Sequence, residues 1–213
     1  YLESVGGKSG AWTDKEHVIY YVKTPVKHIE VAIKYLYELL FNSLLDKNSI
    51  KNEKQIVLEE INRKNDNPEN NIWDLFMEWV WGKQQWAGLS TLGDESTINK
   101  ITKPQLKKYM DNLYIPKNIV ITIVGNMSIS KVRSYFYRSF GEVKKNNIIP
   151  QIQRPVFSPR KSPVKIINSS LSQNQLILGF ITGVSLIHND RYALMLLSSI
   201  LSIGVSSRLF NKI

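Results

Sequence analysis

Residues 49–61, SIKNEKQIVLEEI, form the most informative stretch of this sequence. Apolar residues recur there at helical spacing and a serine opens the stretch as a favoured N-cap, so we predict a helix. Glu53 and Glu60 are seven residues apart, close to two helical turns, and therefore project from nearly the same face. Ile56 and Val57 share that face. Both carboxylates should then be desolvated, a cost that a metal, another cation or hydrogen-bond donors would offset.

On spacing alone, two interpretations of this carboxylate pair are open. In one, Glu53 and Glu60 belong to a metal site or a catalytic site. In the other, they flank the apolar stripe and pair with surface lysines. Glu59 lies about 100° further round the helix, so it is the more solvated of the two adjacent glutamates.

The segments around this helix predict an α+β domain in which helices pack on one face of an antiparallel-dominated sheet. Two β-rich stretches, 9–13 and 17–23, indicate a hairpin, and the second is apolar on both faces, which predicts cover on both sides. Further helices are expected from Pro25, where Ile29, Ile33, Leu36 and Leu40 recur with Ala32 and Leu39 beside them, around Trp73 and Phe76, and at 103–114 and 130–140. A loop is expected at 82–93 and a buried strand at 119–124.

The stretch 144–163 is rich in Pro, Lys, Asn and Ser and has no periodicity, so we interpret it as a linker between domains. It separates residues 1–143, the C-terminal part of a first domain, from residues 164–213. The second region predicts two strands, 164–168 and 175–181, and a helix over 190–201. Because this is too little for an independent core, we expect the truncated start of a second domain.

Composition excludes several classes of protein. With 43% hydrophobic and 22% charged residues, the chain is typical of a soluble globular protein, and no apolar run has the length of a membrane span. The net charge of +10 comes from lysines spread singly or in pairs, which favours a solvated surface over a nucleic-acid site. The lack of cysteine excludes disulfides and thiolate sites. His17, His28 and His188 are scattered, and no phosphate-binding loop or nucleophile elbow is present.

The segment 52–61, NEKQIVLEEI, resembles the distal metal-site helix of the pitrilysin/insulinase-type inverted zincins. These zinc metallopeptidases include mitochondrial processing peptidase. Other parts of the sequence resemble the same family in the same order along the chain: residues 2–7, 10–13, 16–21, 67–69, 88–93, 98–102, 114–126 and 206–210. The resemblance implies the α+β domain of that family, with a second copy beginning after the linker.

The resemblance also implies roles for five residues. Glu60 takes the position of the third protein ligand of zinc, and Glu53 that of a carboxylate that orients a ligating histidine. Gly10, Ala11 and Trp12 belong to the edge strand to which a peptide substrate adds as an extra strand. In the family, zinc polarises a water and the scissile carbonyl, and the glutamate of an H-x-x-E-H motif is the general base.

The H-x-x-E-H motif is absent from these 213 residues, and the usual spacing of the family places it shortly upstream of Tyr1. We therefore expect this chain alone to be inactive, with the remaining zinc ligands outside it. The parent is either a zinc endopeptidase that cleaves peptides or unfolded segments, or a non-catalytic binding or scaffold subunit. Retention of Glu53 and Glu60 favours the first.

The resemblance also suggests partners and a compartment. The expected partners are a polypeptide substrate and the second half of the same protein or a homologous subunit, with no nucleic acid and no membrane span. The bacterial cytoplasm or the mitochondrial matrix is the expected compartment.

Overall fold

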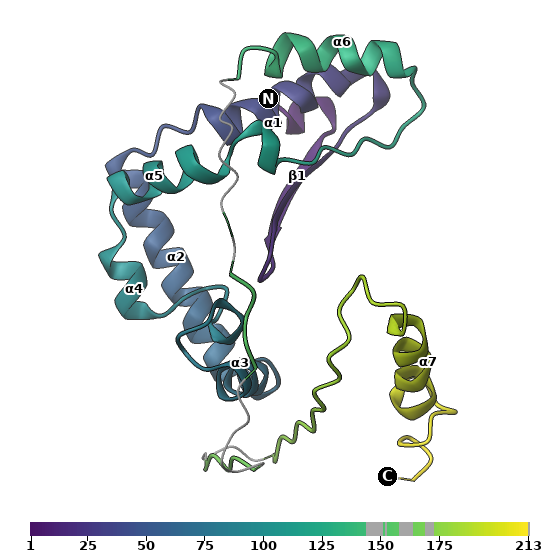
Figure 1. The fold of residues 1–213 in the computed structure, drawn as a ribbon. Coiled ribbons are helices and arrows are strands. Elements are labelled where there is room, and N and C mark those ends of the chain that lie inside the picture. The colour runs from purple at the N-terminus through teal and green to yellow at the C-terminus, as the bar shows by residue number, and fades with distance from the viewer. Residues whose placement is uncertain (144–150, 152, 158–163, 169–172, 213) are drawn as a thin grey trace. The chain divides into compact units, whose positions relative to one another are not determined.

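The computed structural model describes residues 1–143, 151, 153–157, 164–168 and 173–212. The chain divides into two compact units, Tyr1–Gln175 and Leu176–Ile213. The first unit contains a hairpin and most of the helices, and the second contains the helix α7 (Figure 1). The predicted linker, 144–163, lies largely outside the described residues, so the predicted domain boundaries stay a prediction.

The predicted hairpin is confirmed. Strands β1 (Lys8–Thr13) and β2 (Val18–Lys23) pair antiparallel in a two-stranded sheet. The register sets Ala11 opposite Tyr20 and Gly10 opposite Tyr21. At the turn, the backbone N–H of Asp14 donates to the carbonyl of His17 at 2.9 Å.

Helices cover one face of this sheet, as predicted. On that face Ser9 hydrogen-bonds to Tyr35 of α1 at 3.2 Å, and Tyr20 hydrogen-bonds to Tyr114 at 2.7 Å. On the opposite face Ile19 and Tyr21 are exposed. The prediction that β2 is covered on both sides is therefore wrong for the described residues, because the hydrogen bonds to Tyr35 and Tyr114 lie on the Tyr20 face while the other face is exposed.

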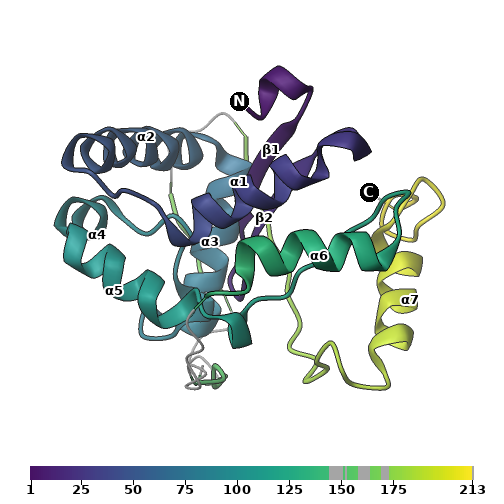
Figure 2. The ribbon, with the colours of Figure 1, turned by 90° about the horizontal axis from the view of Figure 1, so that it is seen from above.

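The helix predicted after Pro25 is α1 (Ile29–Phe41), preceded by the short 3-10 helix η2 (Val26–His28). Its apolar face carries the most buried residue of the core, Ile33, which is 2% exposed. Phe140, the last residue of α6 (Ile129–Phe140), packs edge-on against Tyr37 and Phe41 of α1, with ring centroids 5.3 and 5.8 Å apart. Helix α6 therefore lies alongside α1 (Figure 2).

The carboxylate-bearing helix is α2 (Lys47–Asp66), which is longer at both ends than predicted. Its N-cap is Asp46 and not Ser49, because the Asp46 carboxylate accepts the free N–H groups of the first turn. The expected break follows at Asn67, which caps α3 (Pro68–Trp81). Pro68 at the first position of α3 suits a helix start, where no N–H donor is needed.

The rest of the first unit connects these helices. The predicted loop 82–93 contains the 3-10 helix η3 (Trp86–Gly88), and η1 (Glu3–Val5) precedes β1. Helix α5 (Lys103–Leu113) is confirmed and is followed by η4 (Pro116–Asn118). Helix α4 (Glu95–Lys100) was not predicted, because it is short and its signal is a capping box between Asp94 and Thr97 rather than a long apolar period.

Three predicted strands are wrong. Residues 119–124 form no strand, and Val120 and Val124 are 93% and 94% exposed. Residues 164–168 and 175–181 are also irregular. A β-branched run forms a strand only where a neighbouring strand completes its hydrogen bonds, and the one sheet in the described part of the chain has two strands.

In the second unit, α7 (Arg191–Ser202) confirms the predicted helix. The chain folds back after it, and the N–H groups of Arg208 and Leu209 donate to the carbonyls of Ile200 and Leu201. Ser207 is buried in this turn and accepts a hydrogen bond from the N–H of Phe210. Among the described residues, no helix has both the length and the hydrophobicity of a membrane span.

Candidate metal-binding helix and substrate strand

The first turn of α2 is fixed by its cap. The Asp46 carboxylate accepts from the backbone N–H groups of Asn48 and Ser49, both at 3.0 Å, and from the Ser49 hydroxyl at 2.5 Å. These hydrogen bonds, led by that of the Ser49 side chain, hold the pKa of Asp46 below its ordinary value. The cap therefore favours an ionised carboxylate at the positive end of the helix dipole.

Two lysines tie the packed face of α2 to its neighbours. Lys54 Nζ donates to the carbonyl of Asn99 in α4 at 2.8 Å. Lys64 Nζ forms an ion pair with Asp74 of α3 and also reaches the Ser90 hydroxyl at 3.3 Å. With Ile61 buried between these contacts, the rotation of α2 about its axis is fixed.

Glu53 and Glu60 lie on the same side of α2 and stay open to solvent in this orientation. Both side chains are exposed, and Ile56 between them is 54% exposed. The prediction that these carboxylates are desolvated is therefore wrong for this chain, since the face they share is open. The alternative of pairing with surface lysines is not seen either: within the described residues, neither glutamate forms an ion pair.

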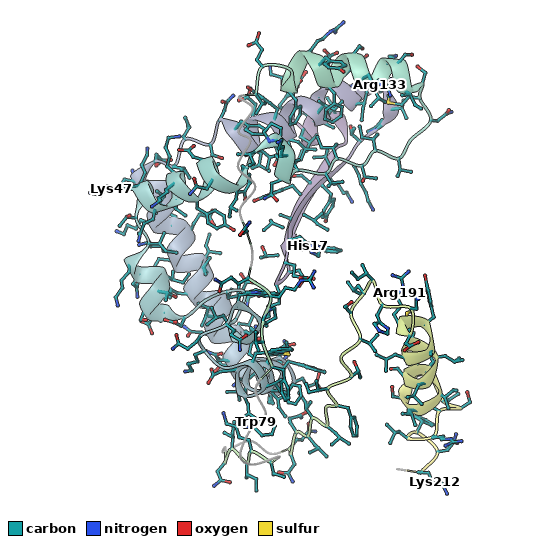
Figure 3. All side chains as sticks on the ribbon, viewed as in Figure 1. His17, Lys47, Trp79, Arg133, Arg191 and Lys212 are labelled. Carbon is teal, nitrogen blue, oxygen red and sulfur yellow. The ribbon has the colours of Figure 1, made fainter. Side chains whose placement is uncertain are left out.

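The described residues do not complete a zinc site. Nowhere among them do three His, Asp or Glu side chains come together. His17 lies at the end of the hairpin, apart from Lys47 where α2 begins (Figure 3), and its imidazole is 3.9 Å from Asp14. His28 immediately precedes α1, and His188 belongs to the second unit.

Glu53 also borders a pocket that sequence reasoning did not find. The cavity, of about 460 Å³, lies between the loop before α2, the start of α2 and the segment from α4 to α5. Its apolar lining includes Leu44, Ile50, Val57, Ile98, Ile101 and Leu106. No single sequence pattern predicts it, because three separate segments build its walls. Glu53 lies at the edge of this pocket, and its side chain stays exposed.

The predicted substrate strand is β1. In the described part of the chain it pairs with β2 alone, so its other edge carries no strand. Trp12 is 60% exposed on the open face of the hairpin. Gly10 lies on the same face beneath the Tyr21 ring, where an added Cβ would come within 2.5 Å of the Tyr21 hydroxyl oxygen. Ala11 faces the covered side instead, because it pairs with Tyr20.

Two contacts that sequence reasoning missed hold the hairpin in place. Burial, together with the hydrogen bond to Tyr20, raises the pKa of Tyr114 above its ordinary value. At the turn, Lys15 Nζ donates to the carbonyl of Leu89, and burial lowers the pKa of Lys15. Both join residues more than seventy positions apart, so no local pattern could reveal them.

Family comparisons cover most of the chain. The family described as insulinase (peptidase family M16) matches residues 1–94, and the peptidase M16 inactive domain matches residues 100–213. A Bacillus subtilis protein named as an uncharacterized zinc protease, YmxG, is 31% identical over the whole of this chain. This chain belongs to the M16 peptidase family. The resemblance to pitrilysin/insulinase-type enzymes is thereby confirmed.

Another relative and two solved structures are also similar to this chain. A Rickettsia felis protein, also named as an uncharacterized zinc protease, is 32% identical to this chain over the whole of this chain. A protease of Helicobacter pylori and an M16 inactive domain of Pseudomonas fluorescens share the fold, with TM-scores of 0.76 and 0.78 over 99% of the chain and 21% and 20% identity. The chain spans about half the length of these proteins: 50% of each zinc protease and 52% and 51% of the two structures.

Proposed function

We propose that this M16 chain is part of a zinc-dependent endopeptidase that cleaves peptides or unfolded protein segments. Glu60 would be one zinc ligand, and Glu53 would orient a histidine ligand. The observation that carries the proposal is the anchored helix α2, which presents both carboxylates on one open face. Relatives named as zinc proteases support the metal.

The chemistry that zinc supplies in such a site is polarisation of a water and of the scissile carbonyl. The contribution of this chain is to hold two carboxylates in fixed directions. Glu60 offers oxygens that carry no ion pair among the described residues. Glu53 would accept the N–H of a histidine and raise its basicity, an effect usually worth about 10-fold to 100-fold in metal affinity.

The hairpin would bind the substrate backbone. The free edge of β1 has the hydrogen-bonding groups that an added peptide strand needs, and the Tyr21 ring lies over Gly10 on the open face beside that edge. Trp12 offers an exposed ring for an apolar substrate side chain. Because strand addition uses backbone groups, it suits extended or unfolded segments better than folded proteins.

The 213-residue chain alone should be inactive, because Glu60 is a single ligand and a zinc site normally has three or four protein ligands. The remaining ligands would come from outside these residues. The partners of the chain would be the polypeptide substrate and the other half of the same protein or a homologous subunit.

The test is peptidase activity of the full-length protein with Glu60→Gln, using Glu59→Gln as the matched control. Both residues are exposed on α2, but Glu59 projects from a different direction. Glu60→Gln should abolish cleavage of an unfolded substrate, while Glu59→Gln should keep it. Equal activity of the two variants would refute the role of Glu60.

A non-catalytic binding subunit is the second candidate. The match of residues 100–213 to the M16 inactive domain supports it. The two candidates differ in the full-length protein, where an H-x-x-E-H motif upstream of α2 belongs to the peptidase alone. A full-length protein that binds unfolded peptides but neither binds zinc nor cleaves would establish the binding subunit.

A further inference from the structure

A short segment that precedes the second unit in the chain, residues 153–157, lies against the loop that follows α3 (Figure 1). The Gln85 amide contacts the backbone of Val156 twice. Its Nε2 donates to the Val156 carbonyl at 2.9 Å, and its Oε1 accepts from the Val156 N–H at 2.5 Å. The side chain therefore pairs with this peptide unit much as a neighbouring β-strand would.

Two aromatic residues extend the contact on either side. The indole N–H of Trp86 donates to the carbonyl of Gln153 at 2.8 Å. The ring of Phe157 packs edge-on against Trp81, with centroids 6.1 Å apart at 82°. Two hydrogen-bonded backbone positions and one aromatic contact thus hold the segment at both ends and near its middle.

The receiving surface also has contacts of its own that hold its shape. Gln85 Nε2 also donates to the carbonyl of Trp81 at 2.8 Å, which fixes the amide at the end of α3. The loop closes tightly behind it, because an added Cβ on Gly88 would come within 2.1 Å of the Gly82 carbonyl oxygen. A fixed amide loses little side-chain entropy on binding, so it pairs better than a free one.

The docked segment is also suited to an extended path. Pro155 fixes its own φ and biases the preceding residue, Arg154, toward extended conformations. This restriction lowers the entropy that docking must overcome. The hydrogen bonds from Gln85 and Trp86 reach only backbone atoms of the segment. The Phe157 side chain contributes the aromatic contact, with the ring of Trp81.

We propose that Trp81, Gln85 and Trp86 form a docking site for an extended peptide segment, and that residues 153–157 of the same chain occupy it. This docking attaches the connection toward the second unit to the first unit up to Phe157. Release would separate residues 153–157 from the first unit. The proposal is independent of zinc and of peptidase activity.

The test is amide hydrogen exchange of the 213-residue chain, with Gln85→Ala compared against Gln84→Ala. Gln84 is the exposed neighbour and forms no hydrogen bond among the described residues. In the unaltered chain the Val156 amide should be protected. Gln85→Ala removes both hydrogen bonds to Val156 and should speed its exchange by about tenfold or more, whereas Gln84→Ala should leave it unchanged.

A variant in the docked segment distinguishes loss of docking from misfolding of the loop that carries Gln85. Phe157→Ala alters only the docked segment and should also speed exchange at Val156, while amides within α3 keep their protection. Pro155→Ala should give a smaller acceleration, about twofold to fivefold. The proposal is overturned if Val156 exchanges like an unstructured peptide in the unaltered chain, or if Phe157→Ala and Gln84→Ala leave the same protection at Val156.

Discussion

Helix α2 and the hairpin are built on the same plan, with one packed face and one open face. On α2, Ile61 is buried, while Glu53 and Glu60 are exposed. On the hairpin, Tyr20 contacts the covering elements, and the opposite face is exposed.

The predicted site residues are distributed unequally between these faces. All but Ala11 lie on the open faces. Stability and the proposed chemistry are therefore carried by different residues of the same elements, and substitutions of the buried and the exposed residues should have separable effects.

The largest expected effect on stability comes from the packed face of α2. Ile61→Ala should destabilise the chain by about 2–5 kcal/mol, because it leaves a cavity where the side chain is 9% exposed. Ile56→Ala on the open face of the same helix is the matched control and should change stability by less than about 1 kcal/mol. Urea unfolding of the two variants measures the contrast, and equal losses would contradict it.

The next effect is on metal affinity and comes from the open face. In the full-length protein, Glu53→Gln should weaken zinc binding about 10-fold to 100-fold, because the histidine that it orients loses a charged partner. The unfolding midpoint of the zinc-free protein should not move. Competition with a chelator measures the affinity, and unchanged zinc binding would remove Glu53 from the site.

A smaller effect is expected at the contact that holds the hairpin. Tyr114→Phe removes the hydroxyl that hydrogen-bonds to Tyr20 and should cost about 1 kcal/mol of stability. Tyr137→Phe, on an exposed ring, should cost nothing measurable. If Tyr114→Phe behaves like Tyr137→Phe in thermal unfolding, the hydroxyl pair does not anchor the sheet.

The smallest effect is a pH dependence at the cap of α2. The pKa of Asp46 is lowered in the folded chain, so the unfolded chain binds more protons at this residue. Its stabilising contribution is present above the ordinary carboxyl pKa and is lost as the pH falls through the lowered folded value. Asp46→Asn should make the free energy of unfolding depend less on pH in the acidic range. The same acid dependence in Asp46→Asn and in the unaltered chain would contradict a stabilising cap at Asp46.

Local patterns in the sequence predicted much of the fold. Helical spacing of apolar residues located α1, α5, α6 and α7, and alternation located the hairpin. The failures share one cause: residues such as Val120 have strand propensity but no strand beside them in the described structure. Propensity is local, whereas a strand depends on a distant partner.

For the candidate site, the sequence predicted which residues share a side of α2 but not how that helix is oriented. Spacing alone placed Glu53 and Glu60 on one face, and the structure agrees. It could not give the rotation of α2, which depends on Lys54 and Lys64 reaching other helices. The desolvation argument failed for that reason, because it assumed that the apolar residues beside the carboxylates turn inward, and Ile56 does not.

Zinc content of the full-length protein tests the central claim most directly. Metal analysis after removal of loosely bound ions should find zinc in the unaltered protein and in Glu59→Gln, and should find it lost in Glu60→Gln. Zinc retained at the same stoichiometry in Glu60→Gln would contradict the account, because Glu60 would then not be a zinc ligand.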